Sequence, residues 1–312
     1  FFNFNLTDTD AAVLTGLPSS YTLSYYETYQ DALLETNPLP ANYTNTTAYN
    51  QFIFARIENG NDCFGINRVE LVVFELPQIV IENQRLYCLN TFPGFIVLDG
   101  GAMNGFPSSF FYNWSTGAIT PQIQINAPGI YTVTVTNTNG CSKLRTITVL
   151  PSNTATFDSI EIVDGIETNS VTVLVSGEGD YEYAMDNEFT GFQDSNLFTG
   201  VGSGLHTVYV RDKNDCGTVK KDIAVIGFPK FFTPNGDGYN DTWHVYGINT
   251  ENQVNSEVSI FDRYGKLLIQ LNPLGAGWDG TFNGVIMPTS DYWFYIKLQN
   301  NKIFRGHFTL KK

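Results

Sequence analysis

The sequence predicts an all-β fold, and three observations carry that prediction. The composition is rich in Thr, Asn, Gly, Tyr, Phe and Val and poor in Lys, Glu, Ala and Met, which is typical of sheets joined by polar turns. Apolar and polar residues alternate with a period of two, as in Tyr-Thr-Val-Thr-Val at residues 131–135. Credible helical periodicity is confined to residues 26–34 and stops at Asn37-Pro38.

A spacing that recurs along the chain predicts the domain organisation. An apolar strand ends six residues before each of Cys63, Cys141 and Cys216, an Asn- or Asp-rich turn follows, and a second apolar strand begins after the cysteine. The cysteines are separated by 78 and 75 residues, which is the size of one small β-sandwich. We therefore expect tandem immunoglobulin-like β-sandwich modules at residues 1–80, 81–151 and 152–227, followed by a small and different β-sandwich domain at residues 228–312.

The charge distribution separates the last domain from the rest. The net charge is −14 overall, but it is −15 over residues 1–226 and +1 over residues 227–312. An acidic surface repels phosphate backbones, so we expect no nucleic-acid partner. The sequence has no apolar run long enough for a transmembrane segment. The first residues lack the pattern of a signal peptide, and we expect the chain to be one end of something longer.

The four cysteines allow one predicted bridge. Cys88 and Cys141 both fall in the module at residues 81–151, and we expect them to pair, which implies an oxidising, extracellular compartment. Cys63 and Cys216 have no obvious partner within their own modules. They are buried free thiols, or Cys63 competes for Cys88 across the first module boundary. The sequence has no CxxC pair of the kind that binds zinc.

Catalytic motifs are missing from the sequence. It contains no HExxH, GxSxG or Walker-type loop. Glu178, Asp180 and Glu182 alternate along one strand, so we expect all three on one solvated face rather than in a paired-carboxylate site. The aromatic residues at 110–112 either stack on sugar rings or fill a sandwich core, and the core is the commoner explanation. We therefore expect no enzymatic activity in these 312 residues.

The richest local motif is the loop that opens the last domain, at residues 231–243. Gly236 and Gly238 permit the bend, and Asn235, Asp237, Asn240 and Asp241 supply hard oxygen ligands of the kind that calcium prefers. The loop lacks the bidentate Glu of a helix-loop-helix calcium site. The alternative is an Asx-rich turn whose side chains bond their own backbone.

Four ordered blocks of the last domain carry a family resemblance. They are residues 232–241, residues 260–266, residues 277–284, and residues 288–295 followed by 306–312. Together they resemble the gliding-motility-associated C-terminal domain of Bacteroidota, also called the type B sorting domain of the type 9 secretion system. Two positions depart from the family pattern: Tyr264 stands where Trp is frequent, and Ser290-Asp291 stands where Gly usually precedes the residue equivalent to Tyr292.

The resemblance implies partners for the domain. The outer-membrane translocon of the type 9 system recognises the folded domain, and a PorP-like outer-membrane β-barrel protein holds the exported chain at the cell surface. Recognition would use folded shape and an edge strand at residues 302–312. We expect the partner-binding residues to be Asn235, Asp237, Arg263, Trp278, Asp279, Arg305, Lys311 and Lys312. From the residue pattern alone, Trp278 and Trp293 are core anchors.

Two functions of different classes follow from these observations. The leading hypothesis is the non-catalytic C-terminal stalk and secretion signal of a large gliding-motility-type surface adhesin, because the module at residues 81–151 also resembles adhesin repeats of Bacteroidota surface proteins. The alternative is a calcium-dependent or carbohydrate-binding module array from a secreted polysaccharide-degrading enzyme. Separately, Asp158-Ser159-Ile160 resembles the O-glycosylation signal of Bacteroidota.

Overall fold

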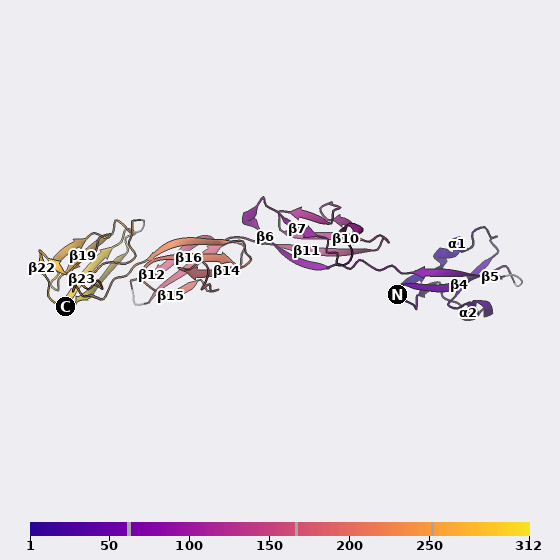
Figure 1. Cartoon of the computed structure of the whole chain (residues 1–312), viewed down its shortest axis with the longest axis horizontal. Coiled ribbons are helices and arrows are strands. Elements are labelled where there is room, and N and C mark those ends of the chain that lie inside the picture. The colour runs from indigo at the N-terminus through magenta and orange to yellow at the C-terminus, as the bar shows by residue number, and fades with distance from the viewer. Residues whose placement is uncertain (61–63, 166–167, 251–252) are drawn as a thin grey trace. The chain divides into compact units, whose positions relative to one another are not determined.

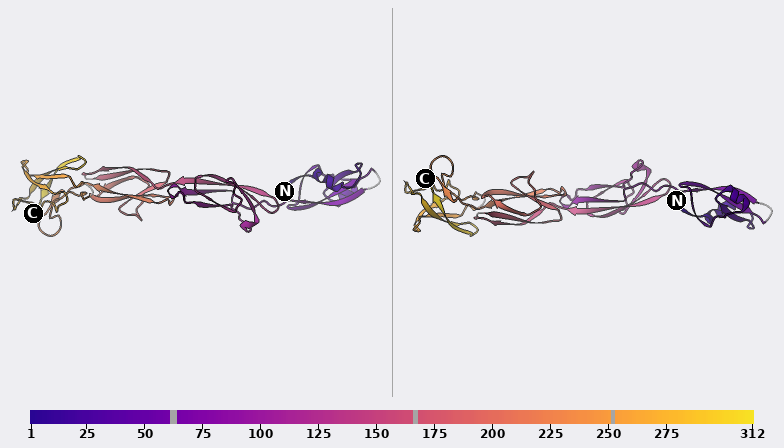
Figure 2. Two further views of the ribbon diagram at one scale, coloured as in Figure 1. Left: turned by 90° about the horizontal axis from the view of Figure 1, so that it is seen from above. Right: turned by 90° about the horizontal axis from the view of Figure 1, so that it is seen from below.

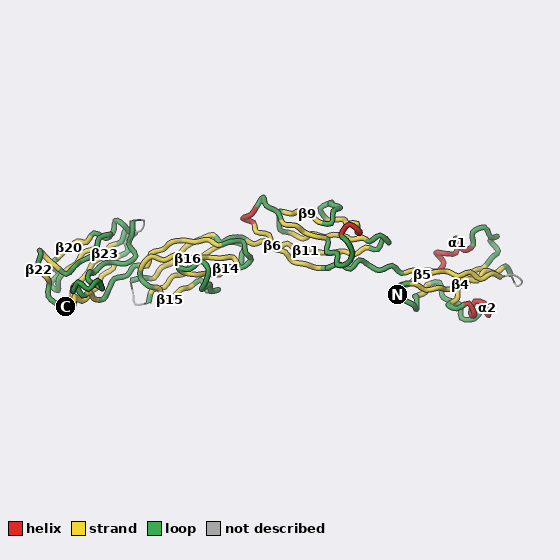
Figure 3. Tube along the Cα trace, viewed as in Figure 1, coloured by secondary structure: helices red, strands yellow, loops and turns green. Residues whose placement is uncertain are grey.

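The computed structural model covers residues 1–60, 64–165, 168–250 and 253–312 and confirms the all-β prediction (Figure 1). Helical segments of the covered residues are short (Figure 3): α1 at Asp10–Val13, α2 at Tyr29–Leu34, and 3-10 turns at Leu6–Thr9, Leu89–Thr91 and Pro107–Ser109. The chain divides into two compact units. The first comprises Phe1–Gln84, Val97–Ile125 and Ile130–Thr148, and the second comprises Arg85–Ile96, Asn126–Gly129 and Val149–Lys312.

The first unit begins with a three-stranded antiparallel sheet of order β2-β4-β5 and a two-stranded pair of β1 and β3. Their bounds are Asn3–Asn5 (β1), Thr22–Tyr26 (β2), Asn42–Thr44 (β3), Asn50–Glu58 (β4) and Phe64–Val72 (β5). Alternate residues of these strands, including Tyr25, Ile53 and Leu71, are buried in one core. The strand pair predicted to flank Cys63 is confirmed as β4 and β5, while Cys63 itself lies outside the described residues.

The predicted helix at residues 26–34 is correct in type but wrong at its start. Tyr26 is the last residue of β2 and is buried, and α2 begins only at Tyr29. The reason is a helix cap: the hydroxyl of Thr28 accepts a hydrogen bond from the backbone N–H of Asp31 at 3.0 Å. The periodicity of apolar residues extends across the cap, so it did not indicate that the helix begins at Tyr29.

The remaining sheets of this region are a four-stranded sheet of order β6-β11-β10-β8 and the pair of β7 and β9. The bounds are Glu82–Cys88 (β6), Ile96–Asp99 (β7), Phe111–Trp114 (β8), Gln122–Ile125 (β9), Gly129–Thr136 (β10) and Ser142–Ser152 (β11). Trp114 of β8 is a core residue, and its indole N–H donates to the carbonyl oxygen of Thr120 at 2.8 Å. The hairpin that carries Cys141, formed by β10 and β11, is also confirmed.

The second unit contains two three-stranded sheets, of order β12-β13-β15 and β14-β16-β17, which share one core of buried valines. The bounds are Thr156–Val163 (β12), Asn169–Ser176 (β13), Tyr181–Met185 (β14), Leu197–Val201 (β15), Gly204–Asp212 (β16) and Thr218–Val225 (β17). Val171 and Val173 of β13 meet Val208 and Val210 of β16 in this core. The hairpin around Cys216 is confirmed as β16 and β17.

The C-terminal part of the second unit has a five-stranded sheet of order β18-β24-β23-β19-β20 and a two-stranded hairpin of β21 and β22. Figures 1 and 2 show this part in orange and yellow at the C-terminal end of the chain. The bounds are Phe231–Phe232 (β18), Glu257–Phe261 (β19), Leu267–Leu271 (β20), Thr281–Phe282 (β21), Val285–Ile286 (β22), Ser290–Lys297 (β23) and Ile303–Leu310 (β24). The strands β23 and β24 form the closing hairpin of the domain and pair over their full length. The domain limits predicted at residues 80, 151 and 227 stay predictions.

The predicted Cys88–Cys141 disulfide is wrong. Cys88 is bonded to Cys216, 128 residues further along the chain, and Cys141 is a free cysteine. Cys88 at the end of β6 belongs to the second unit, whereas Cys141 belongs to the first unit, where its Sγ lies 3.8 Å from the carbonyl oxygen of Phe74. Cys216 is therefore not the buried free thiol that the sequence offered as one alternative, and its partner lies outside its own predicted module. The bridge joins two predicted modules, so reasoning within one module had no means of finding it.

Candidate functional site: the surface of the C-terminal sheet

An aromatic core holds the five-stranded sheet in place. The ring of Trp243 stacks on that of Phe308 at a centroid distance of 4.3 Å and an interplanar angle of 16°. Trp243 and Trp278 also form a backbone bridge, with N–H to carbonyl distances of 2.9 and 2.8 Å. Gly277 lies against this bridge with φ of 92°, and a Cβ there would approach the Trp243 carbonyl oxygen to 2.6 Å. The sheet is therefore a rigid platform for its surface residues.

The two tryptophans predicted as core anchors have different fates. Trp278 is a core residue, with only 1% of its surface exposed, and its indole N–H donates to the Thr281 carbonyl oxygen at 2.8 Å. Its expected direct contact with a partner is therefore wrong for the folded domain. Trp293 is 42% exposed, so its prediction as a core anchor is also wrong. Neighbouring residues of β23 alternate between the two faces, and Tyr292 and Phe294 occupy the buried one.

The Asn235–Asp241 loop is organised around one carboxylate. Asp241 Oδ1 accepts from the backbone N–H groups of Asn235 at 3.0 Å and Gly236 at 2.7 Å, and Oδ2 accepts from that of Gly238 at 2.7 Å. Asp237 repeats the pattern on a smaller scale, because its Oδ1 accepts from the N–H of Tyr239 at 2.8 Å. These contacts match the Asx-rich turn that the sequence offered as the alternative to a metal site.

The hydrogen bonds of this loop change the acidity of Asp241. Donation from the backbone N–H of Gly236, then of Gly238 and Asn235, lowers the pKa of the Asp241 carboxyl below its ordinary value of 3.8. The ionised form is thus the one that the loop requires. Asp241 therefore couples the conformation of the loop to pH.

Calcium binding at Asn235, Asp237, Asn240 and Asp241 stays a prediction. In the part of the chain that the structure covers, no three His, Cys, Asp or Glu side chains gather in a way that would hold a metal ion. The oxygens of Asp241 already accept N–H groups, as does Asn235 Oδ1, which bonds the N–H of Asp237 at 3.1 Å. A cation at this loop would have to replace some of these bonds or share oxygens with them.

Two further turns present predicted partner-binding residues. Asp262 Oδ1 accepts from the N–H groups of Tyr264 and Lys266, each at 2.9 Å, and closes the turn that displays Arg263. Gly265 occupies the left-handed position of this turn, with φ of 80°. Asp279 Oδ1 bonds the N–H of Thr281 at 2.9 Å and so shapes its own turn.

The outer face of the sheet gathers aromatic and basic side chains from β23 and β24. Arg305 lies over the ring of Tyr295, with 5.3 Å between its Cζ and the ring centroid. The rings of Trp293 and His307 lie 6.1 Å apart. The register pairs Tyr295 with Arg305 and Trp293 with His307, so the four side chains are neighbours on one face.

Sequence reasoning found Arg305 in this group and missed Trp293, Tyr295 and His307 as surface residues. A signal for them existed, because strict alternation along β23 and β24 places Arg305 and His307 on one face. It could not say which face is buried, since both faces of β23 carry aromatic residues. Of the remaining predicted partner residues, Lys311 lies with its Nζ 4.3 Å from the Phe231 ring centroid, and Lys312 is exposed.

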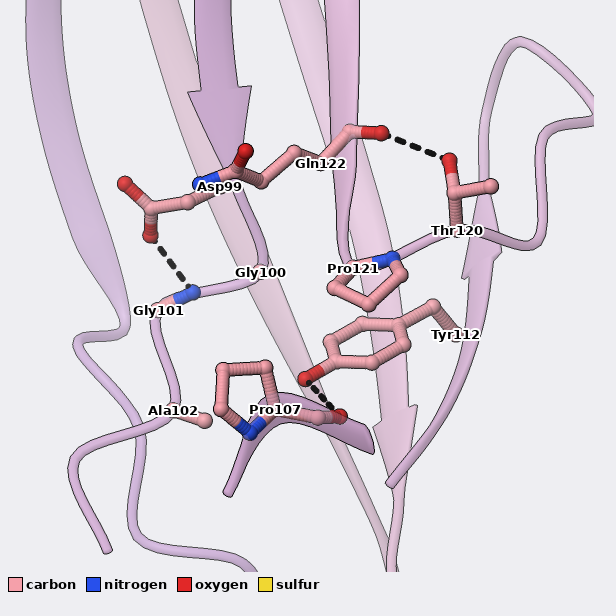
Figure 4. A pocket seen from close by; sticks show the side chains of 9 residues that line it. All are labelled: Asp99, Gly100, Gly101, Ala102, Pro107, Tyr112, Thr120, Pro121 and Gln122. Carbon is pink, nitrogen blue, oxygen red and sulfur yellow. Dashed lines mark hydrogen bonds between the residues drawn. The ribbon is translucent and has the colours of Figure 1, made fainter. Parts of the chain in front are cut away.

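A pocket of about 670 Å³ lies in the first unit between β7, β8 and β9 (Figure 4). The Tyr112 hydroxyl donates to the Pro107 carbonyl oxygen at 2.9 Å, and the Gly101 N–H donates to Asp99 Oδ1 at 2.8 Å. Burial raises the pKa of Tyr112, with the Asp99 charge adding to the effect. Tyr112 is thus a core residue at the rim, and the pocket adds Asp99 and Gln122 as polar groups.

The carboxylates considered for catalysis do not share one solvated face as expected. Glu178 and Asp180 are exposed, but Glu182 is partly buried and forms an ion pair with Arg211 at 2.6 Å. Arg211 is held in turn over the ring of Phe192 at 3.9 Å. Glu182 therefore has a structural partner.

Comparison with known protein families finds a match at each end of the chain. Residues 226–310 match the CHU_C type IX secretion signal domain, and residues 1–77 match the Flavobacterium inter-domain disulphide bond domain. The chain is a Bacteroidota protein sorted by the type IX secretion system. The type IX signal indicates export to the cell surface or the extracellular space and recognition by the type IX secretion machinery. No curated protein matches the chain.

Several solved structures resemble the chain at low identity. Immunoglobulin domains 1–5 of Sidekick-1 align with 12% identity and a TM-score of 0.34, covering 95% of this chain and 75% of that one. The N-terminal eight immunoglobulin domains of Down Syndrome Cell Adhesion Molecule align with 11% identity and a TM-score of 0.31, covering 94% and 43%. SGBP-B of the Bacteroides ovatus mixed-linkage glucan utilization locus, in complex with a mixed-linkage heptasaccharide, aligns with 14% identity and a TM-score of 0.20, covering 76% and 71%.

The helices of the covered residues are all too short or too polar to cross a membrane.

Proposed function

We propose that the chain is the non-catalytic C-terminal stalk and anchoring signal of a large cell-surface adhesin of the gliding-motility type. The observation that carries this proposal is the match of residues 226–310 to a type IX secretion signal, on a domain with a buried aromatic core and an exposed aromatic and basic face. In this proposal, the sheets that precede this domain serve as a spacer at the cell surface.

Anchoring in this proposal depends on the C-terminal domain at residues 228–312. It binds the type IX translocon during export and a PorP-like outer-membrane β-barrel protein afterwards. Asn235, Asp237, Arg263 and Asp279 shape or occupy exposed turns, and Arg305 lies on the exposed face of the sheet. These features suit recognition of a folded shape rather than of a short linear peptide.

The test is export of the chain with and without residues 228–312 in a Bacteroidota strain that has an active type IX system. We expect the truncated chain to stay inside the outer membrane, measured by protease accessibility and by blotting of cell fractions. Surface display of the truncated chain would contradict the sorting role. In a strain that lacks the PorP-like protein, release of the exported full chain into the medium would support the anchoring role of that partner. Retention of the chain at the surface of that strain would contradict this role.

A second candidate function is a carbohydrate-binding module array of a secreted polysaccharide-degrading enzyme. The observation that favours it is the pocket of about 670 Å³ lined by Asp99, Tyr112 and Gln122, which is large enough for a small ligand. Phe111 is exposed on the opposite face of β8 from Tyr112 and offers a separate ring for sugar stacking outside the pocket. A glycan array with the full chain separates the two candidates, because affinity that Phe111→Ala and Gln122→Ala abolish would favour the second.

A further inference from the structure

The last strand of the chain has an outer edge that is only partly paired. Thr309 donates its backbone N–H to the Lys230 carbonyl oxygen at 2.9 Å, and Lys311 donates to that of Phe232 at 3.0 Å. These N–H groups therefore point away from β23 and toward β18. The pairing of β18 with β24 is confined to Phe231 with Thr309 and Phe232 with Leu310.

The direction of the Thr309 N–H fixes the direction of its neighbours. In a strand of an antiparallel pair, the backbone N–H and C=O of one residue point to the same edge of the strand. Those of the next residue point to the opposite edge. The N–H and C=O groups of Ile303, Arg305 and His307 therefore point to the same outer edge as those of Thr309. Within the covered ranges, no strand pairs with β24 on that edge at residues 303–307. An edge of this kind is a template for another strand.

A groove of about 650 Å³ runs beside this edge. Its lining includes the rings of Phe228, Phe231 and Phe294 together with Gly306 of β24, and Gly165, Ser203 and Gly227 bound it as well. A Cβ on Gly306 would lie 2.8 Å from the Phe294 ring, so only glycine leaves that ring in place beside the strand. A guest strand next to residues 303–307 would direct alternate side chains toward this apolar groove.

The charge around the edge restricts the guest strand further. Lys311 lines the groove, and Arg305 is exposed on the outer face of the same strand. The remaining alternate side chains of a guest would lie beside Arg305 and His307. Acidic groups complement these positions, and lysine or arginine would be repelled.

We propose that the outer edge of β24 at residues 303–307 binds an extended segment of a partner protein, in which apolar and acidic residues alternate, by adding it as a strand to the sheet. The proposal rests on the proposed function, because it names the mode by which the sorting domain is recognised. It corrects the expectation of a free edge over residues 302–312, since β18 covers the end of that strand.

The first test is hydrogen exchange of the full chain, followed by NMR. The amide hydrogens of Arg305 and His307 should exchange at least about tenfold faster than those of Phe304 and Gly306, which face β23. Adding a short capped peptide that alternates glutamate and valine should slow the exchange of Arg305 and His307. Protection of these two amides in the free chain, or no response to the peptide, would overturn the proposal.

Matched variants test the contribution of the backbone N–H to peptide binding, and matched peptides test the contribution of charge. His307→Pro removes an outward N–H without breaking the ladder to β23, because edge strands tolerate proline at such a position. His307→Ala keeps that N–H. We expect His307→Pro to weaken peptide binding by about tenfold or more, a loss of about 1.4 kcal/mol, while His307→Ala stays within a few-fold of the wild type. A lysine-valine peptide that binds as well as the glutamate-valine peptide would also contradict the proposal.

Export assays with the same variants in cells distinguish the sorting function of residues 228–312 from its recognition by strand addition. If the chain without residues 228–312 is still displayed at the surface, the proposed sorting function fails. If that truncation blocks display but His307→Pro is displayed as well as His307→Ala, only the strand-addition mode fails. Circular dichroism of each purified variant confirms that it remains folded. Size-exclusion chromatography tests whether a second copy of the chain occupies the edge, and dimerisation through it would contradict a separate partner.

Discussion

The turns that carry Cys141 and Cys216 share a sequence spacing but differ in their chemistry. In the first, Asn137 Oδ1 accepts from the N–H groups of Asn139 and Cys141, each at 3.0 Å. In the second, Asp212 Oδ2 accepts from the Cys216 N–H at 3.3 Å. The capping residue lies four positions before the cysteine in both turns. One cysteine is free, and the other is in a disulfide.

The difference lies in what each turn meets in space. The turn at Cys141 meets the segment at Phe74 and Glu75, whose carbonyl oxygens accept from Cys141 Sγ at 3.8 Å and from Asn137 Nδ2 at 2.8 Å. The turn at Cys216 meets the end of β6, where Cys88 supplies the second sulfur and Asn90 Nδ2 donates to the Cys216 carbonyl oxygen at 3.0 Å. A repeated turn therefore specifies a docking position, and the neighbouring segment decides whether that position becomes covalent.

The largest expected effect comes from removing the disulfide. Cys88→Ser or Cys216→Ser should lower the free energy of unfolding of the second unit by about 3–5 kcal/mol, because the bridge closes a loop of more than one hundred residues. Urea unfolding of the purified chain, followed by intrinsic fluorescence, measures the change. Cys141→Ser is the matched control and should cost less than about 1 kcal/mol. Equal losses for all three variants would show that the two turns are energetically alike.

The next effect concerns the capping residues. Asp212 is fully buried, and its carboxylate also accepts from the Ser152 hydroxyl at 2.7 Å and from the Asp180 N–H at 3.0 Å. Asp212→Ala should destabilise by about 3 kcal/mol, because it leaves these buried donors unsatisfied. Asn137→Ala, in the more exposed turn, should cost only about 1 kcal/mol. Chemical unfolding of both variants checks the order, and a larger loss for Asn137→Ala would reverse the comparison.

A third loop, at Asn235–Asp241, extends the comparison to pH. Its folded-state pKa at Asp241 is below the ordinary 3.8, so the stabilisation is fully present above that value and is lost as the pH falls below it. The difference in melting temperature between the wild type and Asp241→Asn should therefore be constant near neutral pH and shrink in acid. Asp158→Asn, at an exposed site on β12, controls for general charge effects. A difference that stays constant down to strongly acid pH would contradict this role of Asp241.

The smallest effect on stability, but the sharpest on chemistry, concerns thiol reactivity. Cys141 is a partly exposed free cysteine, so iodoacetamide should alkylate it in the folded chain. Cys88 and Cys216 should react only after reduction. Peptide mass mapping of alkylated protein, with and without dithiothreitol, reads each site separately. Alkylation of Cys216 without reductant would contradict the disulfide, and an unreactive Cys141 would contradict its free state.

Local sequence signals were sufficient for most of the fold. The alternation along residues 131–135 predicted β10, and the spacing around Cys141 and Cys216 predicted two hairpins that the structure confirms. The turn at Gly265 and the closing hairpin of β23 and β24 were also predictable, because glycine at a left-handed position and paired aromatic strands are local features. The position of α2 was less predictable, since the cap at Thr28 overrode the periodicity.

Long-range features were decided by the tertiary structure alone. The sequence determined an all-β chain, a distinct and more basic C-terminal domain, and an Asx-rich loop at its start, because these follow from composition and from neighbours along the chain. Only the tertiary structure decided that Cys88 pairs with Cys216, that Trp293 faces outward while Trp278 is buried, and that β18 pairs with β24 at Thr309 and Leu310. Each of these depends on which face or edge another segment covers. A period of two in the sequence states that two faces differ, but it does not state which one the rest of the molecule will bury.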